Sequence, residues 1–489
     1  MVLSNFSVYH SSVALITFIL VYVVLFAIRG LWFSKYSHIP GPRLCKVSRL
    51  WLLYFDLRLQ RTAKVHEWHL KYGSVILVAP GEVSFSKPSA TREIYGTSGR
   101  HPKSSFFDSF IAYGQRATFN SLPYDKHRVN RSHSFSFFQA SSIYLPRFVE
   151  PVRGRMAAFL NQVKQDIDHS RGTITLDFFQ LTNRYAFDNI TRLLFGPDYC
   201  TRLIELPDAE REILDDLKYC EAMQPLRFNF RPAYYIYKFA ASIINQNPHF
   251  LTGEDKLEQW NTKKVADSAA VAQPGDNQST LLGILRARKS KQGEPLPESW
   301  IKAELLDNLN AAQMTVTVTL TYVLWNIARN PEWQVRIREE ISALPIQEDG
   351  FPSFGDINKS PIFDACIKES YRLNPISSGR AERVVPVDKK YDGIFIPRNV
   401  STGIPTVNEQ QQKTCLDNES ANLDMWPTDN RIDIDPCHAA LWVCLHPATY
   451  LQSESLASSK PRPPPHHGKI LHAIWVWGAA MPWQGFRHS

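Results

Sequence analysis

Lys368-Glu-Ser-Tyr-Arg-Leu-Asn-Pro375 is the stretch that decides the fold, because it places Glu369 and Arg372 three residues apart on a predicted helix. Such a pair is not diagnostic alone, since residues at i and i+3 face each other on any surface helix. Arg383-Val-Val-Pro386 follows, and Tyr391-Asp-Gly393-Ile-Phe-Ile-Pro397 predicts a strand-turn pair. The order of these segments therefore carries more information than the Glu-Arg pair itself.

Upstream, a long helical stretch is predicted from Glu304 to Ile341, with a second helix that begins at Asn330-Pro331, because proline is favoured in the first helical turn. Inside the stretch, Ala311-Ala-Gln-Met-Thr315-Val316 places one hydroxyl among small and apolar side chains. A buried apolar helix would also account for Met314 and Val316.

Tyr124-Asp-Lys-His127-Arg128 is a third segment of interest. The planar guanidinium of an arginine binds a carboxylate through two parallel hydrogen bonds, so Arg128 is a candidate for holding an acidic ligand group. A solvated basic end of a helix is the alternative interpretation of this segment.

Composition describes a folded protein of 489 residues, with 44% hydrophobic residues and a net charge of +8 that forms no basic block. A nucleic-acid surface is therefore disfavoured, whereas an acidic protein partner or anionic lipid suits the charge. Seven scattered cysteines without a C-x-x-C pair argue against a disulfide framework or zinc site. The body is predicted to be mostly helical, with strands at Ser74–Val78 and Glu82–Phe85 and a surface loop at 262–280.

The N-terminus predicts a membrane anchor, because Val13–Ile28 is almost wholly apolar and Leu31–Phe33 extends it. A cleaved signal peptide is the alternative, but no positive charge precedes the run and no small-x-small cleavage site follows. The basic residues lie on its C-terminal side, which predicts a cytosolic body and a lumenal N-terminus with a glycosylation sequon at Asn5-Phe-Ser7. His38-Ile-Pro-Gly-Pro42 then predicts a stiff, non-helical connection.

In this order, across residues 15–406, the segments resemble the heme-thiolate monooxygenases of the cytochrome P450 family. The resemblance implies a mainly α fold with a small β region behind one transmembrane helix, in the endoplasmic reticulum membrane. It also implies heme (iron protoporphyrin IX), electrons from NADPH through the partner NADPH-cytochrome P450 reductase, and an apolar small-molecule substrate. A fungal secondary metabolite is expected by analogy with relatives of this architecture.

The resemblance assigns roles to single residues. Arg128, His127, Arg372 and Arg383 are expected on the heme side, directly or by bracing, and Glu369 is expected to hold Arg372. Thr315 is expected to handle oxygen and protons as the catalytic residue. The helix departs from the family pattern A-G-x-D/E-T-T, since Ala312 replaces Gly, Met314 replaces the acid and Val316 replaces the second Thr. A thioether cannot relay a proton, which puts ordinary O–O cleavage in doubt.

The heme-cysteine loop of the family, F-x-x-G-x-R-x-C-x-G, cannot be found in the printed chain. Its cysteine sulfur must bind the iron and its glycines let the loop pack tightly. Cys437 and Cys444 lie at a tolerable distance from Glu369, but neither has glycines nearby. No metal ligand is therefore assigned.

A shifted reading frame restores this loop. Trp and Met each have a single codon. In the shifted frame, each new codon takes the last two bases of one residue's codon and the first base of the next codon, so the amino acids that replace Trp and Met are determined. Trp475, Trp477 and Trp483 must then read as Gly, Met481 must read as Cys, and Ile474 and Ala479 permit Phe and Arg. The result is F-G-x-G-x-R-x-C-x-G, and Leu451 to Ala457 permits F-x-P-x-R-W in the same frame. We therefore expect that the frame is lost after Thr406, as a retained intron near Val407 would cause.

The sequence thus predicts an anchor at 1–34, an incomplete P450-like catalytic domain at 35–406 and an irregular, aberrant tail at 407–489. Three functional alternatives stay open. They are a heme-thiolate monooxygenase, a P450-type enzyme that rearranges peroxides or isomerises its substrate, which Met314 would suit, and a heme-less inactive product of a mis-spliced or frame-shifted gene. A genuine divergent tail is the alternative to the frame shift.

Overall fold

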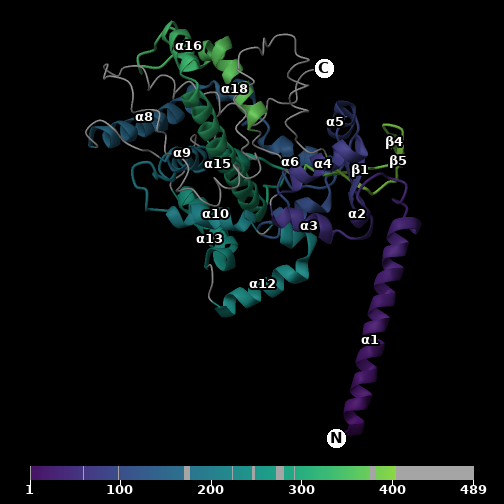
Figure 1. The fold of residues 1–489 in the computed structure, drawn as a ribbon. Helices are drawn as coiled ribbons and strands as arrows, with labels where there is room; N and C mark the ends of the chain where they lie inside the picture. The colour runs from purple at the N-terminus through teal and green to yellow at the C-terminus, as the bar shows by residue number, and fades with distance from the viewer. Residues whose placement is uncertain are drawn as a thin grey trace. The chain divides into compact units, whose positions relative to one another are not determined.

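The computed structural model describes residues 2–403 apart from 59, 97, 170–176, 223, 245–247, 271–279, 291 and 375–380. Over these ranges the chain is mainly helical with a small β region, so the predicted fold class is confirmed (Figure 1). The tail predicted at 407–489 lies outside the described residues. The chain divides into two compact units.

The first unit combines three stretches of the sequence, Met1–Phe106, Pro225–Arg231 and Ser378–Gln410. Its helical elements are α1 (Val2–Ile28), the π-helical η1 (Arg29–Phe33), α2 (Arg43–Val47), α3 (Leu50–Leu57), α4 (Arg61–Tyr72), α5 (Pro88–Tyr95), the 3-10 turn η2 (Ser105–Phe110), which runs on into the second unit, and most of α11 (Gln224–Asn229). One span among the described residues, Val13–Phe33, is helical, long and apolar enough to cross a membrane.

A four-stranded sheet in the order β1-β2-β6-β3 joins the first and last of these stretches. The strands are β1 (Val75–Ala79), β2 (Glu82–Phe85), β3 (Arg383–Val384) and β6 (Ser401–Gly403), while β4 (Lys389–Tyr391) and β5 (Ile394–Ile396) form a hairpin. Every residue of β1 and β2 is buried, which explains the continuous apolar run of β1. The predicted strands at 74–78 and 82–85 and the strand-turn pair at 391–397 correspond to observed strands.

The proline-rich connection after the anchor packs on this sheet. The amide N–H of Leu77 donates to the carbonyl oxygen of Pro40 at 2.7 Å. Gly41 has φ +149°, and a Cβ there would lie 2.5 Å from the Leu77 carbonyl oxygen, so only glycine fits this close approach.

The second unit combines Phe107–Gln224 and Pro232–Ser377, and its described elements are helices. They are α6 (Tyr124–Ser134), α7 (Ala140–Ile143), α8 (Pro146–His169), α9 (Phe178–Phe195), α10 (Arg211–Ala222), α12 (Arg231–Ile244), α13 (Pro248–Ala270), α14 (Leu281–Ala287), α15 (Glu298–Arg329), α16 (Pro331–Ser342), α17 (Phe354–Ile357) and α18 (Pro361–Leu373). The long helix α15 runs through this unit and packs along α9 (Figure 1).

The helix bounds confirm one prediction and show that another is wrong in part. The long helix and the second helix at Asn330-Pro331 are confirmed, because α15 ends at Arg329 and α16 begins at Pro331. The surface loop predicted at 262–280 is wrong for 262–270, where α13 continues. Val265 is buried there with 1% exposure, so apolar packing extends the helix beyond the position that composition indicated. Residues 271–279 are not described.

Candidate active site

Thr315 lies on an open face of α15. The side chains of Ala311 and Thr315, one turn apart, are exposed in the middle of a helix of 32 residues, whereas Leu309, Gln313 and Thr317 are buried. The Thr315 hydroxyl donates to the carbonyl oxygen of Ala311 at 2.7 Å. Because this bond uses its proton, the hydroxyl oxygen presents its lone pairs to any ligand on the open face.

A buried polar cluster behind Thr315 was not predicted from the sequence. Gln313 Nε2 donates to Asn183 Oδ1 on α9, and the Thr317 hydroxyl lies 3.4 Å from the same oxygen. Both Gln313 and Thr317 are almost fully buried, at 2% and 0% exposure. The cluster ties the segment that carries Thr315 to α9, and its partners are 130 residues apart in sequence, so no local pattern could have indicated it.

The loop before α6 is fixed to the same long helix. The Thr118 amide donates to Glu304 Oε2 at 2.7 Å, and Trp300 Nε1 donates to the Arg116 carbonyl oxygen at 3.1 Å. Glu304 is 2% exposed and precedes Ala311 by seven residues, which is two helical turns on the same face. This loop therefore approaches the face of α15 that carries Thr315.

Arg128 and His127 lie on α6. The Arg128 side chain is exposed and has no hydrogen-bond or ion-pair partner among the residues described here, while His127 is half-buried. Asn130, on the same helix, donates to the Ser121 hydroxyl at 2.7 Å and fixes the preceding loop to α6. An exposed guanidinium without a protein carboxylate is available for a carboxylate ligand.

Glu369 and Arg372 form a two-point ion pair on α18. Arg372 Nε and Nη2 donate to the two carboxylate oxygens of Glu369 at 2.7 and 2.5 Å. The side chains are 3% exposed for Glu369 and 18% exposed for Arg372, so the pair is largely removed from water. Of the predicted site residues, these two are brought into direct contact.

Arg383 belongs to β3 in the first unit, separate from the unit that holds the other predicted site residues. Its guanidinium carbon lies 5.2 Å from the ring centre of Tyr95, and Nη1 donates to the carbonyl oxygens of Ala381 and Glu382. Burial lowers the pKa of Arg383, and the neighbouring Tyr95 partly offsets that effect. The group stays charged at neutral pH, since arginine titrates far above it.

The described residues offer a cation for a heme carboxylate. Arg128 has no hydrogen-bond or ion-pair partner among them, so it would pair with a heme propionate. The iron of a heme-thiolate enzyme would need a cysteine thiolate. Burial raises the pKa of Cys45 and of Cys366 to about 12. The third cysteine side chain within the described part, Cys200, donates to the Pro197 carbonyl oxygen, and burial raises its pKa as well. No cluster of metal-binding side chains occurs in the ranges described.

Comparisons with known proteins agree with this geometry. The family model for cytochrome P450 matches residues 40–412. Cytochrome P450 monooxygenase FGM1 of Gibberella zeae is 38% identical over 76% of this chain and 74% of its own length. Cytochrome P450 monooxygenase BOT1 of Botryotinia fuckeliana is 24% identical over 79% of this chain and 76% of its own. Tryprostatin B 6-hydroxylase of Aspergillus fumigatus is 24% identical over 81% of this chain and 67% of its own. The chain belongs to the cytochrome P450 family.

Proposed function

We propose that the gene encodes a monooxygenase that inserts one atom of O2 into an apolar small molecule, while the other atom leaves as water. Two electrons come from NADPH through a reductase. The observation that carries the proposal is the open face of α15, where Ala311 and Thr315 are exposed while Leu309, Gln313 and Thr317 are buried. A fungal secondary metabolite is the proposed substrate class, because relatives include a tryprostatin B 6-hydroxylase.

The side chains of the protein are proposed to bind the heme, to brace its binding site and to hold a proton on the open face of α15. Arg128 and Arg383 bind the heme carboxylates, and Glu369 fixes the fork of Arg372 as a brace. Thr315 accepts a hydrogen bond on the open face while it donates to Ala311. Met314 cannot supply a proton, so water must do so. A bound heme would supply the activation of O2.

We propose further that the frame is lost after Thr406 and that the printed tail replaces a native heme loop. The match to the family model ends at residue 412, which supports the proposal that the sequence beyond this region departs from the pattern of the family. The proposed parts of the chain are accordingly the anchor at 1–34, the catalytic domain at 35–406 and the aberrant tail at 407–489. The printed chain would then be an anchored protein without heme, and the restored chain the enzyme.

The proposal is tested by expressing two proteins, the printed chain and a chain that reads the shifted frame across 451–483. After reduction, a carbon monoxide difference spectrum should give a thiolate-type band for the restored chain alone. A thiolate band from the printed chain would refute the assignment of the tail. Sequencing of the transcript that encodes residues 400–489 provides the independent check, because a stop codon within the shifted heme loop would end the frame hypothesis.

Met314 is the observation that favours a second candidate, an enzyme that rearranges peroxides without a proton-relaying acid. Dependence of turnover on NADPH and reductase separates the two, since only the monooxygenase needs external electrons.

The proposed location is the endoplasmic reticulum membrane with the catalytic body in the cytosol. Protection of a tag placed before Asn5 from protease in sealed microsomes tests that orientation.

A further inference from the structure

Asn183 on α9 lies against the face of α15 that is opposite Thr315. Gln313 and Thr317 stand two residues before and two residues after Thr315, and at about 100° per residue both fall on the far side of the helix. Gln313 Nε2 donates to Asn183 Oδ1, and the Thr317 hydroxyl lies 3.4 Å from the same oxygen. One carboxamide oxygen therefore contacts both residues that flank Thr315, and these three side chains, Asn183, Gln313 and Thr317, are here called the clasp.

A second contact of the same kind lies one turn farther along α15. The hydroxyl oxygens of Thr182 and Thr321 are 3.0 Å apart, and the two side chains are 1% and 7% exposed. Thr182 precedes Asn183 on α9, and Thr321 follows Thr317 by one helical turn. Two successive contacts therefore fix the rotation of α15 against α9.

The segment that carries Thr315 is a poor helix former by itself. Residues 315–321 read Thr-Val-Thr-Val-Thr-Leu-Thr, and six of the seven are β-branched, which lowers helix propensity because these side chains lose freedom against the preceding turn. Each of the four hydroxyls donates to the carbonyl oxygen four residues earlier, at 2.7 or 2.8 Å. Such bonds compete with the helical ladder and tend to bend the helix. Tertiary contacts must therefore hold this part of α15 in place.

The helix α9 is a fixed support for the clasp. Asp177 caps its first turn with a side-chain hydrogen bond of 3.2 Å to a backbone amide. Farther along, the buried carboxylate of Asp188 accepts from the Thr201 hydroxyl at 2.7 Å and from the Leu203 amide at 2.8 Å. Asn183 lies between these two attachments and is 8% exposed, so its carboxamide has little freedom to move away from α15.

We propose that Asn183 is a positioning residue for Thr315. Its carboxamide oxygen holds α15 at the rotation where the Thr315 hydroxyl faces the open side, although Asn183 itself lies behind the helix. A rotation in either direction would replace that hydroxyl with a neighbouring apolar side chain, Met314 or Val316. The inference rests on the proposed function, in which Thr315 handles oxygen and protons.

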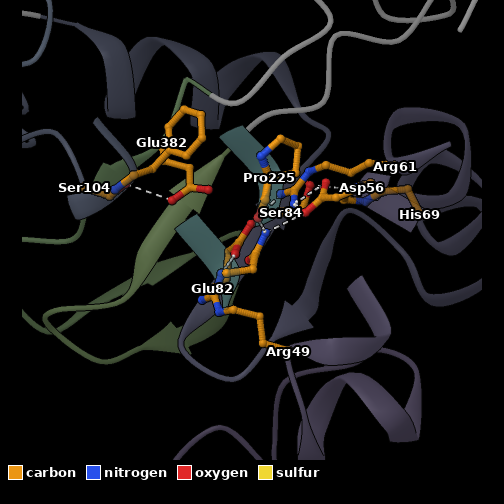
Figure 2. A network of polar contacts seen from close by, with 11 residues as sticks. Arg49, Asp56, Arg61, His69, Glu82, Ser84, Ser104, Pro225 and Glu382 are labelled. Atoms are coloured by element: carbon orange, nitrogen blue, oxygen red, sulfur yellow. Dashed lines mark hydrogen bonds and ion pairs between the residues drawn. The ribbon is translucent and has the colours of Figure 1, made fainter. Parts of the chain in front are cut away.

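A buried polar pair in the first unit provides a matched control (Figure 2). The Ser84 hydroxyl donates to His69 Nε2 at 2.8 Å, and His69 Nδ1 donates to the Gly73 carbonyl oxygen at 2.9 Å. His69 and Ser84 are 7% and 4% exposed, so the pair joins α4 to β2 through a hydrogen bond as buried as that of the clasp. It lies in the unit that does not carry Thr315. Ser84→Ala therefore removes a comparable hydrogen bond without altering α9 or α15.

The first test follows hydrogen exchange of the printed chain in detergent micelles, with peptides mapped by mass spectrometry. In Asn183→Ala, exchange at 315–321 should rise about tenfold relative to exchange at 331–342 in α16, because the segment loses its clasp. Asn183→Asp keeps an acceptor oxygen at the same place, and its exchange ratio should stay within about threefold of that of the parent chain. Ser84→Ala should leave the ratio unchanged. An equal rise in both peptides of Asn183→Ala would overturn the assignment, since Asn183 would then act only on the stability of the whole unit.

The second test asks where the Thr315 hydroxyl points, and it uses the restored chain with carbon monoxide as the probe. The infrared band of carbon monoxide on the heme iron is sensitive to hydrogen-bond donors beside it. Thr315→Val sets the reference shift, and Asn183→Ala should shift or split the band in the same direction, whereas Ser84→Ala should not change it. A shift in Thr315→Val with an unchanged band in Asn183→Ala overturns the positioning role and leaves the monooxygenase proposal standing. A restored chain without a thiolate-type band refutes the proposed function instead, and the exchange test on the printed chain then decides the inference.

Discussion

Replacement of Glu369 by glutamine should destabilise the protein far more than the loss of a surface ion pair. The substitution keeps the size of the side chain and one carbonyl acceptor but removes the charge that faces Arg372. The two hydrogen bonds lost or weakened, at 2.5 and 2.7 Å, join a carboxylate of 3% exposure to a guanidinium of 18% exposure. Breaking a buried ion pair costs about 3–5 kcal/mol, and the partial exposure of Arg372 reduces the expected loss to about 2–4 kcal/mol.

The assay is urea unfolding of the full chain in detergent micelles, followed by far-ultraviolet circular dichroism. Lys368→Gln is the matched control, because Lys368 pairs with Asp364 on the same helix at 2.7 Å but is 59% exposed. An exposed pair of this kind contributes about 0.5 kcal/mol or less. Equal losses in the two variants would refute the reasoning, because the Glu369–Arg372 pair would then be as hydrated as a surface pair. In the double variant with Arg372→Gln, the loss should be smaller than the sum of the two single losses.

Three further predictions concern buried groups. Cys45 and Cys366 should react with iodoacetamide at pH 8 about 1,000-fold more slowly than an unperturbed thiol, because their pKa is about 12 and not 9.0; rapid alkylation of the folded chain would contradict this. Asp188→Ala should lower the free energy of unfolding in urea by about 3–6 kcal/mol, because the buried carboxylate accepts hydrogen bonds from one hydroxyl and two backbone amides. A loss below about 1 kcal/mol, as for one exposed hydrogen bond, would argue against the burial of this carboxylate. Glu304→Ala should raise hydrogen exchange at the Thr118 amide at least tenfold, and unchanged protection would mean that Glu304 does not hold the loop.

Local patterns predicted the elements well where one segment decides its own structure. β1 follows from the apolar run at 75–79, and the break between α15 and α16 follows from Asn330-Pro331, since proline cannot continue a helix but suits its first turn. The loop prediction at 262–280 failed for its first nine residues, because polar composition on the exposed side concealed the buried Val265.

The site was predictable only in its parts. Glu369 and Arg372 are near neighbours in sequence, so their pairing could be expected from helical spacing. The contact of Asp56 with Asn229 spans 173 residues, and that of Gln313 with Asn183 spans 130. Such pairs depend on how distant helices and strands come together, which no periodicity within one segment encodes. The functional roles of Thr315, Arg128 and Arg383 stay predictions.

The parallel pairing of β2 with β6 has a consequence for synthesis in the cell. Because β6 (Ser401–Gly403) completes the sheet that begins with β1, the ribosome must deliver more than 300 residues before the first unit can close. These last strand residues precede Thr406, after which the frame is proposed to be lost. A product that fails only beyond that point therefore carries all four strands of the sheet. Quality control that recognises an unpaired central strand would therefore find none in this sheet, because β2 keeps β6 as its partner.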